Sequence, residues 1–429
     1  MTKTNWMCAA VRATALITAA FAGCHAAAAS TQPAPPPRIC VDNQCTATVS
    51  PPPPSGGSGS HTIKWNPGHY MGSNTVLHAP ASIGRVQSEM DDINNQDAIL
   101  GYRIFITWGA LEPTQGNYDF STVDAILNRL TTAYNKPKRL AMMLWIYGNG
   151  ALSQNDSSVI PMYIQQGASY GASPVPGRYG WWGQNSNGAS TGMYAVAAYN
   201  PAVMDRLIAL VQALGQHLDG NPYFEAIDMQ EDATIAQAAT GMGSQDPSYS
   251  DSAWRTQLQR FLTAATAAFP HTSVIMDNSW FDRPASGVAL EQWMIANRVA
   301  PGSSDTWGQS ALNAYGTSHL SDGMQTLMGV DQNGGGVDLR PQARAMLQVE
   351  GPDILGPYFA AYGGPWQAPD IVNALNQSYW ASHAFWTHLN GTEVFRGASV
   401  LPWAKWKNLA PTLAQHPLIH TDYPPNYPP

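Results

Sequence analysis

The chain carries little charge for its length. Only 12% of its 429 residues are charged, against about a quarter in ordinary soluble domains. The net charge is −8, and the sequence contains no basic stripe of the kind that binding to a nucleic-acid backbone requires. The composition therefore argues against nucleic acids and anionic membrane surfaces as partners.

Cysteine is also scarce, with four residues in the whole chain. Cys8 and Cys24 fall in the amino-terminal leader, whereas Cys40 and Cys45 stand five positions apart in one polar segment. In an exported protein such a pair favours a small disulfide loop. Metal binding is the alternative, but two cysteines without a further His or Cys pair do not complete a zinc site. We expect no metal.

The longest early apolar run is too short to cross a bilayer. Residues 13–22 follow two basic residues and have the length of a signal-peptide core rather than of a mature transmembrane helix. Residues 1–29 are thus predicted to be an export signal. Cleavage before Cys24, at a segment that resembles a bacterial lipoprotein box, and cleavage after the small residues 27–29 both remain open. We expect a bacterial protein that is secreted, periplasmic or on the outer surface, with a lipid at Cys24 in the first case.

Low-complexity sequence is confined to the two ends. Residues 30–60 contain two proline runs and a Gly/Ser run, which is typical of a linker that is stiff in one part and flexible in another. Residues 61–419 show no second break, so they are expected to form one domain. Residues 420–429 are predicted to be a loose Pro-rich tail.

Aromatic residues and short apolar runs are plentiful, with 15 Trp and 18 Tyr. Apolar runs alternate with stretches of helical periodicity, a pattern that favours parallel β/α units and a (β/α)8 TIM barrel. The predicted strands are 62–70, 101–108, 139–147, 223–230, 273–280, 304–315, 343–349 and 397–403. The predicted helices are 83–94, 122–133, 203–218, 254–268 and 371–389.

Two of the predicted strands end in a glutamate. Glu231 follows the fourth strand and Glu350 follows the seventh. The carboxyl-terminal ends of barrel strands surround the active site, so the two carboxylates are expected to face one substrate. Such a pair is what glycosidic bond cleavage requires.

Residues 102–120, YRIFITWGALEPTQGNYDF, carry a more specific pattern. An R-x-x-x-x-W strand is followed by an L-E-P-x-x-G-x-Y-D-F loop. This segment resembles the second βα unit of the retaining (β/α)8 glycoside hydrolases, the clan that includes cellulases and β-galactosidases. The family usually has Asn before the acid/base glutamate, whereas Gln230 stands here, an amide one methylene longer.

The resemblance implies roles for particular residues. By position, Glu231 corresponds to the acid/base residue and Glu350 to the nucleophile, while Gln230 would bind the sugar's 2-hydroxyl. Trp403, in a segment that resembles the eighth strand, would be a sugar platform. No cofactor is implied.

Several other residues are candidates for substrate contact. Arg103 lies in an apolar strand and must be paired there; pairing with Glu350 would orient the nucleophile, and a purely structural ion pair is the alternative. Asp228 and Asp277 are weaker catalytic candidates, and for Asp228 a structural hydrogen bond or ion pair is the alternative. Further candidates for a sugar-binding role, each with core packing as its alternative, are Trp145, Trp280, His69, Trp181 and Trp182. Tyr315, in the predicted sixth strand, could hydrogen-bond the nucleophile at the substrate site.

The sequence thus predicts an exported glycoside hydrolase that cleaves β-linked oligo- or polysaccharide with retention of configuration. A non-catalytic carbohydrate-binding lipoprotein on the same barrel is the rival from another class, and turnover on a panel of glycosides separates the two. An inverting glycosidase is the nearer alternative.

The leader and linker give the first testable prediction. Mass spectrometry of the mature protein should find a lipidated Cys24 or an amino terminus near Ser30, and no free thiol at Cys40 or Cys45. Retention of Met1 would contradict export, and two titratable thiols would contradict the disulfide.

Overall fold

A computed structural model describes most of the region from residue 61 to the carboxyl terminus. The described residues are 38–39, 61–149, 155–171, 177–183, 193–230, 232–240, 246–278, 285–303, 338–350, 368–388, 394–395, 398–399 and 410–429. Within them, no helix is both long enough and apolar enough to cross a membrane.

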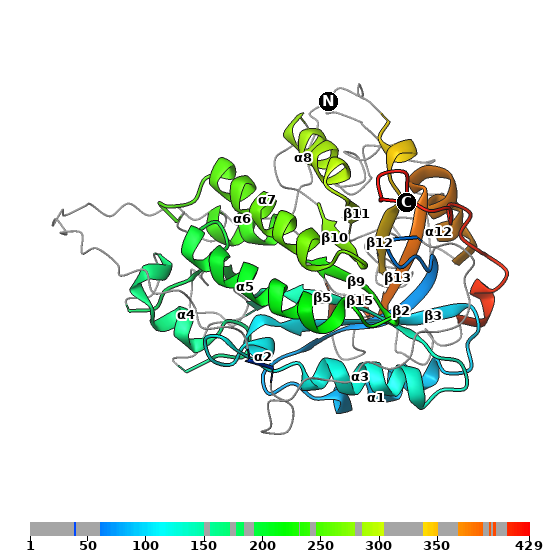
Figure 1. The fold of residues 1–429 in the computed structure, drawn as a ribbon, viewed down its shortest axis with the longest axis horizontal. Helices are drawn as coiled ribbons and strands as arrows, with labels where there is room; N and C mark the ends of the chain where they lie inside the picture. Colours follow the sequence, from blue (N-terminus) through cyan, green and yellow to red (C-terminus); the bar gives the residue numbers. More distant parts are fainter. Residues whose placement is uncertain are drawn as a thin grey trace.

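Eight parallel strands close into a barrel (Figure 1). In chain order they are β2 (Gly68–Leu77), β3 (Ile99–Thr107), β5 (Arg139–Trp145), β9 (Phe224–Met229), β10 (Ser273–Asp277), β11 (Val299–Ser303), β12 (Ala345–Glu350) and β13 (Ala381–His388). Each pairs with the next, and β13 pairs with β2 to complete the ring. The predicted (β/α)8 fold is confirmed.

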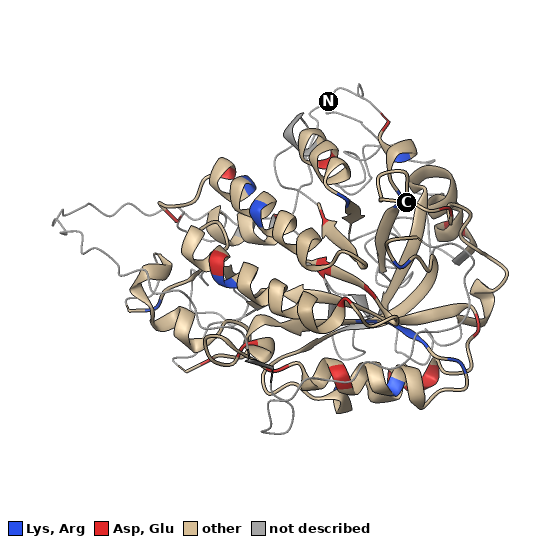
Figure 2. Ribbon diagram, in the orientation of Figure 1, with Lys and Arg blue, Asp and Glu red and all other residues tan. Residues whose placement is uncertain are grey.

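Helices cover the outside of the barrel. Those described are α1 (Gln87–Asp92), α2 (Trp108–Leu111), α3 (Ser121–Thr132), α5 (Pro201–Leu218), α6 (Asp232–Thr240), α7 (Asp251–Ala268), α8 (Ala285–Ala296) and α12 (Ala368–Ala374). Short 3-10 turns are η1 (Ile83–Arg85), η2 (Ala168–Tyr170) and η4 (Arg340–Gln342), and η5 (Leu375–Tyr379) is a π-helical turn. Figure 2 shows that most of the ribbon carries neither acidic nor basic residues, as the composition requires.

The two longest helices show how local sequence sets their starts. Asn200 accepts a hydrogen bond from the backbone N–H of Ala202 and Pro201 occupies the first turn of α5, while Ser250 caps α7 through the N–H of Ala253. A side-chain oxygen at this position satisfies one of the unpaired N–H groups of a helix start. The helices then lie side by side and bury their apolar faces (Figure 1).

A small three-stranded sheet is built after β5, between the third and fourth strands of the barrel. It contains β6 (Tyr147–Asn149), β7 (Trp181–Trp182) and β8 (Met193–Val196), with α4 (Met162–Gln166) beside them in the chain. Two further two-residue pairings join β1 (Arg38–Ile39) to β4 (Asn117–Tyr118) and β14 (Val394–Phe395) to β15 (Ala398–Ser399).

The barrel interior is a packed layer rather than a channel. Seven strands each contribute one buried side chain to it, namely Tyr70, Ala141, Ala226, Ile275, Ala300, Met346 and Phe385. On β3 the place is taken by Gly101, where an added Cβ would stand 2.7 Å from the Tyr70 ring. A glycine is needed because the Arg139 carbonyl oxygen, 2.3 Å from that Cβ position, and the tyrosine ring already fill the space.

The predicted positions of strands one, six and eight are wrong. Strand one is β2, which overlaps the predicted range 62–70 only at residues 68–70. Strand six is β11, which ends at Ser303, one residue before the predicted range begins. The predicted range itself, residues 304–315, lies outside the described part. Strand eight is β13, within the stretch 371–389 that was predicted as one helix. The helical turns stop at Trp380, which has a left-handed backbone (φ 54°), and the buried residues after it pair on both sides. The segment 397–403 is therefore not the eighth strand.

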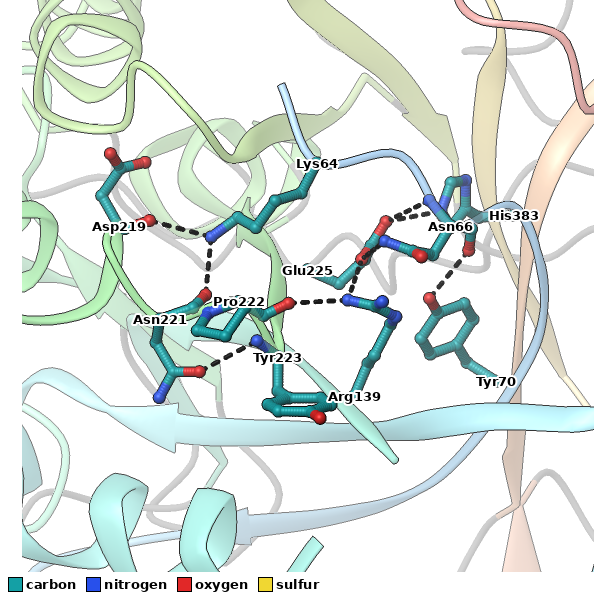
Figure 3. A network of polar contacts seen from close by, with 10 residues as sticks. All are labelled: Lys64, Asn66, Tyr70, Arg139, Asp219, Asn221, Pro222, Tyr223, Glu225 and His383. Carbon is teal, nitrogen blue, oxygen red and sulfur yellow. Dashed lines mark hydrogen bonds and ion pairs between the residues drawn. The ribbon is translucent and has the colours of Figure 1, made fainter. Parts of the chain in front are cut away.

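Buried polar groups close the amino-terminal end of the barrel (Figure 3). Both Glu225 oxygens accept hydrogen bonds from Asn66, one from its backbone N–H at 2.9 Å and one from its side chain at 2.8 Å. Arg139 and His383 approach the same carboxylate at 3.6 and 3.4 Å. Lys64 donates to the backbone oxygens of Asp219 and Asn221 beside this cluster.

The sequence led us to expect a loose carboxyl-terminal segment. In the structure this segment is instead attached to the amino-terminal end of the barrel. Tyr423 stacks on His61 with ring centroids 3.9 Å apart and accepts from the backbone N–H of Ile63. The Trp65 indole donates to the Thr421 carbonyl, and Tyr427 is buried. Residues 61–66 and 421–429 therefore form a clasp, in which each segment is held by the other.

Acid pH should unfold the protein partly through Glu225. Burial alone would raise the pKa of this carboxyl, but His383, Arg139 and Asn66 outweigh burial and lower the pKa to about 2 from 4.5. A lowered carboxyl pKa stabilises the fold above the unfolded value, and that stability is lost as pH falls from about 4.5 toward 2. The loss from this one group is about 3 kcal/mol.

Glu225→Gln should flatten this part of the profile of unfolding free energy against pH, measured by urea denaturation. Asp97→Asn is the control, because Asp97 pairs with Lys136 on the surface and such pairs contribute little. Equal slopes below pH 4.5 in wild type and Glu225→Gln would contradict the assignment.

Candidate active site

The strands that carry the two predicted glutamates are the fourth and the seventh of the barrel. Glu350 is the last residue of β12, and Glu231 follows Gln230 just beyond the end of β9. Both positions are at the carboxyl-terminal end, where barrels bind substrate. The structure describes the backbone of Glu350 but not its side chain, and Glu231 lies outside the described residues. Their pairing stays a prediction.

Arg103 of β3 crosses the barrel interior just below this end. Its side chain is 1% exposed. Nη2 forms an ion pair with Asp228 of β9, and Nη1 donates to Gln348 Oε1 of β12 at 2.8 Å. Neither strand is a neighbour of β3 in the sheet, so both contacts pass through the interior. One guanidinium therefore joins the two strands that end at the predicted glutamates.

The third nitrogen of this guanidinium, Nε, is available for another acceptor. Among the described residues, no acceptor lies within hydrogen-bonding distance of Arg103 Nε. Glu350 stands two residues beyond Gln348 on β12, and alternate residues of a strand share one face. The described contacts thus allow the predicted Arg103–Glu350 pair, which stays a prediction. The ion pair that the structure describes is the one with Asp228.

A second carboxylate approaches the same arginine. Asp277, at the end of β10, lies with Oδ2 3.9 Å from Arg103 Nη2 and is buried. Burial raises the pKa of Asp228 to about 6, although Arg103 opposes that rise. The ion pair of Asp228 is the structural role that the sequence left as its alternative to catalysis.

Gln230 is buried at the end of β9. Its Oε1 accepts a hydrogen bond from the backbone N–H of Ile146 at 2.9 Å, which ties β9 to the residue after β5. Within the described part of the chain, its amide nitrogen meets no acceptor. The geometry therefore fixes the carbonyl side of the amide and leaves its two N–H groups for a ligand.

An aromatic series leads outward from Arg103. The guanidinium lies 5.2 Å from the Phe105 ring centroid, Phe105 stacks on Trp145 at 5.2 Å, and Trp145 contacts Tyr147 at 4.4 Å. Trp145 and Tyr147 are half-buried. Trp145 is thus at the carboxyl-terminal end of the barrel, as predicted, but its ring is already engaged by two aromatic neighbours.

Trp181 and Trp182 form β7 of the small sheet and are 4% and 7% exposed. Trp181 packs edge-on against Tyr194 at 5.9 Å. Side chains this buried offer little ring surface to a sugar, so the described packing favours the core role that was the alternative for them.

His69 requires a correction, because it is not in the mouth of the barrel. It is the second residue of β2, near the opposite, amino-terminal end. Nε2 lies 2.9 Å from the His416 carbonyl, and Nδ1 accepts from the Trp386 indole at 3.0 Å. Burial lowers the pKa of His69 to about 4. It is a neutral core histidine with both ring nitrogens bonded, and the predicted sugar contact is wrong.

The remaining candidates lie outside the described residues, and they are Trp280, Tyr315, Trp403, Cys24, Cys40 and Cys45. For Trp403 the predicted setting is nevertheless wrong, because the eighth strand is β13. Within the described residues no group of three or more His, Cys, Asp or Glu side chains is arranged to hold a metal ion.

The L-E-P motif has a structural role that the sequence did not reveal. Glu112 is fully buried and accepts hydrogen bonds from the Trp108 indole and the Gly116 N–H, each at 2.8 Å. It also pairs with Arg206 of α5. Glu112 therefore fixes the turn after β3 and joins it to a helix that is distant in sequence. Gln348 was missed as well, since an amide inside an apolar strand gives no sign of which charge it meets.

Comparison with known proteins gives structural likeness only. No family model and no curated protein sequence matches the chain. Among solved structures it is similar to GH5_18 from Streptomyces cattleya in complex with GlcNAc (12% identity, TM-score 0.48, covering 82% of this chain and 80% of that one). It is also similar to the catalytic domain of beta-amylase from Paenibacillus polymyxa (10%, 0.48, 82% and 99%) and to beta-mannanase from the blue mussel Mytilus edulis (12%, 0.43, 85% and 99%).

Glu112→Ala should destabilise the protein strongly. The change removes the acceptor for two buried donors and leaves Arg206, 11% exposed, without its partner. Breaking a buried pair in this way costs about 3 to 5 kcal/mol, which chemical denaturation can measure. Asp205→Ala, which breaks an exposed pair with Arg260, is the control and should have a small effect. Similar losses in both variants would assign Glu112 no special role.

Proposed function

We propose that this chain is a glycoside hydrolase that cleaves β-linked oligo- or polysaccharide with retention of configuration. The observation that carries the proposal is the bridge made by Arg103. One buried guanidinium contacts β9 and β12 through the barrel interior, just below the two strand ends that carry Glu231 and Glu350. A positive charge at that depth suits a site whose chemistry uses an ionised carboxylate as its nucleophile.

The proposed reaction has two steps. Glu350 attacks the anomeric carbon while Glu231 donates its proton to the leaving oxygen, so the glycosidic bond breaks and a glycosyl-enzyme ester forms. Glu231, now ionised, then takes a proton from water. The resulting hydroxide attacks the anomeric carbon and releases Glu350 as a carboxylate. No cofactor takes part.

The charges around Arg103 fit these roles. A guanidinium donor beside Glu350 would favour its ionised form, which is the form that attacks. An ionised Glu350 would in turn raise the pKa of Glu231 and keep its proton available. The Gln230 amide, fixed through its oxygen to Ile146, would direct its N–H groups to the sugar.

The polysaccharide substrate accords with the proposal that the protein is exported. The leader, the linker and Cys24 or Ser30 as the mature amino terminus would place the barrel outside the cytoplasm, where such polymers occur. A non-catalytic carbohydrate-binding barrel and an inverting glycosidase remain the competing functions, and the product of turnover distinguishes all three.

The carboxyl pair is tested by substitution. Glu350→Ala should abolish turnover of aryl β-glycosides, and added azide should restore some product of inverted configuration by replacing the missing nucleophile. Glu231→Ala should impair substrates with poor leaving groups most, because only those need the proton. Folding of both variants is checked by circular dichroism.

The anomer first formed by the wild type, followed by NMR, decides the mechanism. A product of inverted configuration would leave hydrolysis intact but remove the nucleophile role of Glu350. Full activity in Glu350→Ala would remove the pair altogether, and absence of turnover on every glycoside would favour the binding protein.

A further inference from the structure

Among the described residues, one cation stands against two anions inside the barrel. Arg103 Nη2 pairs with Asp228 and lies 3.9 Å from Asp277 Oδ2, and all three side chains are at most 2% exposed. They come from β3, β9 and β10. The other groups described around the guanidinium are uncharged, namely Gln348, Met143 and the rings of Phe105 and Phe385.

The strand beside Asp277 leaves room for its carboxylate. An added Cβ at Gly302 of β11 would stand 2.2 Å from Asp277 Oδ1, far inside contact distance. Gly302 is also the residue paired with Asp277 across the sheet. A smaller apolar residue in place of Asp277 would need no such space, so the barrel accommodates a carboxylate at this position in particular.

Two aspartates beside one arginine are more than a simple ion pair, because the carboxylates outnumber the guanidinium. One guanidinium neutralises one carboxylate, and a buried charge without a partner is costly. Loss of one carboxylate still leaves an anion against Arg103 Nη2, whereas loss of both leaves that nitrogen with no carboxylate among the described residues. Asp228 holds the guanidinium directly, and Asp277 supplies a second countercharge from the adjacent strand.

We propose that Asp228 and Asp277 act together as positioning residues that hold Arg103 at the base of the catalytic site, and that either carboxylate alone is sufficient. The proposal rests on the proposed function for its catalytic part. Its structural part, the dependence of one buried cation on two interchangeable anions, stands on the contacts alone.

The test is a double-mutant cycle with Asp228→Asn, Asp277→Asn and the double variant. Asparagine keeps the shape and an acceptor oxygen, so only charge is removed. Each single variant should lower kcat by less than about 10-fold, and the double variant by about 100-fold or more, as should Arg103→Met, which is the scale of one preorganised electrostatic contact. KM should change little in all of them. Glu225→Gln, equally buried at the other end of the barrel, should lose stability and keep kcat.

Urea unfolding gives a readout that does not need activity. The midpoint should fall much more in the double variant than the sum of the two single effects. If the double variant does not fold, adding Arg103→Met to it should restore folding, because the buried guanidinium that lacks a carboxylate at Nη2 is then gone. Additive midpoints, or no recovery in the triple variant, would overturn the proposal.

The outcomes separate the two levels of inference. Turnover that survives Glu350→Ala, or no turnover on any glycoside, defeats the proposed function and leaves the unfolding cycle to decide the charge cluster. Turnover that needs Glu350 but is unchanged in the double variant defeats the positioning role alone. An Asp228→Asn variant as slow as the double variant would show that Asp277 contributes nothing and would also overturn the proposal.

Discussion

A buried arginine organises the middle of this barrel. Arg103 is almost fully enclosed, and a guanidinium in such surroundings must be neutralised and hydrogen-bonded to be tolerated. Its contacts are made with residues of β9, β10 and β12, so the requirement of one side chain fixes the relative depth of three strands that it does not pair with. The polar layer above the apolar ring of Tyr70 and Phe385 follows from that requirement.

The two ends of the barrel are treated differently. At the amino-terminal end, Glu225 and its donors fill the interior, and the aromatic clasp of residues 61–66 and 421–429 covers it. Each of these polar groups has partners within the protein. At the other end, the guanidinium and the Gln230 amide keep donors that no described residue engages. Unused donors beside strand ends are suited to ligand binding, and this asymmetry favours a site at the carboxyl-terminal end.

Several buried acids that look alike in the sequence have different tasks. Glu112 holds a turn and a helix, Glu225 closes the base of the barrel, and Asp228 pairs with the central arginine. Each lies in or beside an apolar run. Only the identity of the partner tells them apart, and every partner comes from a different element of the fold.

The sequence alone determined the barrel class, because alternation of apolar strands and amphipathic helices is a local property. Five strands were predicted within a few residues for the same reason. It also placed Glu231 and Glu350 after the fourth and seventh strands. Strand eight was missed because residues 381–387 are buried on both faces and mix polar with apolar side chains. The sequence therefore shows no strand alternation there and gives no sign of the left-handed Trp380 at which the helical turns end. The tertiary structure decided the partners of Arg103, the neutral core role of His69 and the attachment of the last residues. Those outcomes depend on contacts between residues far apart in sequence, for example 125 positions for Arg103 and Asp228 and 347 for His69 and His416, and no local pattern carries that information.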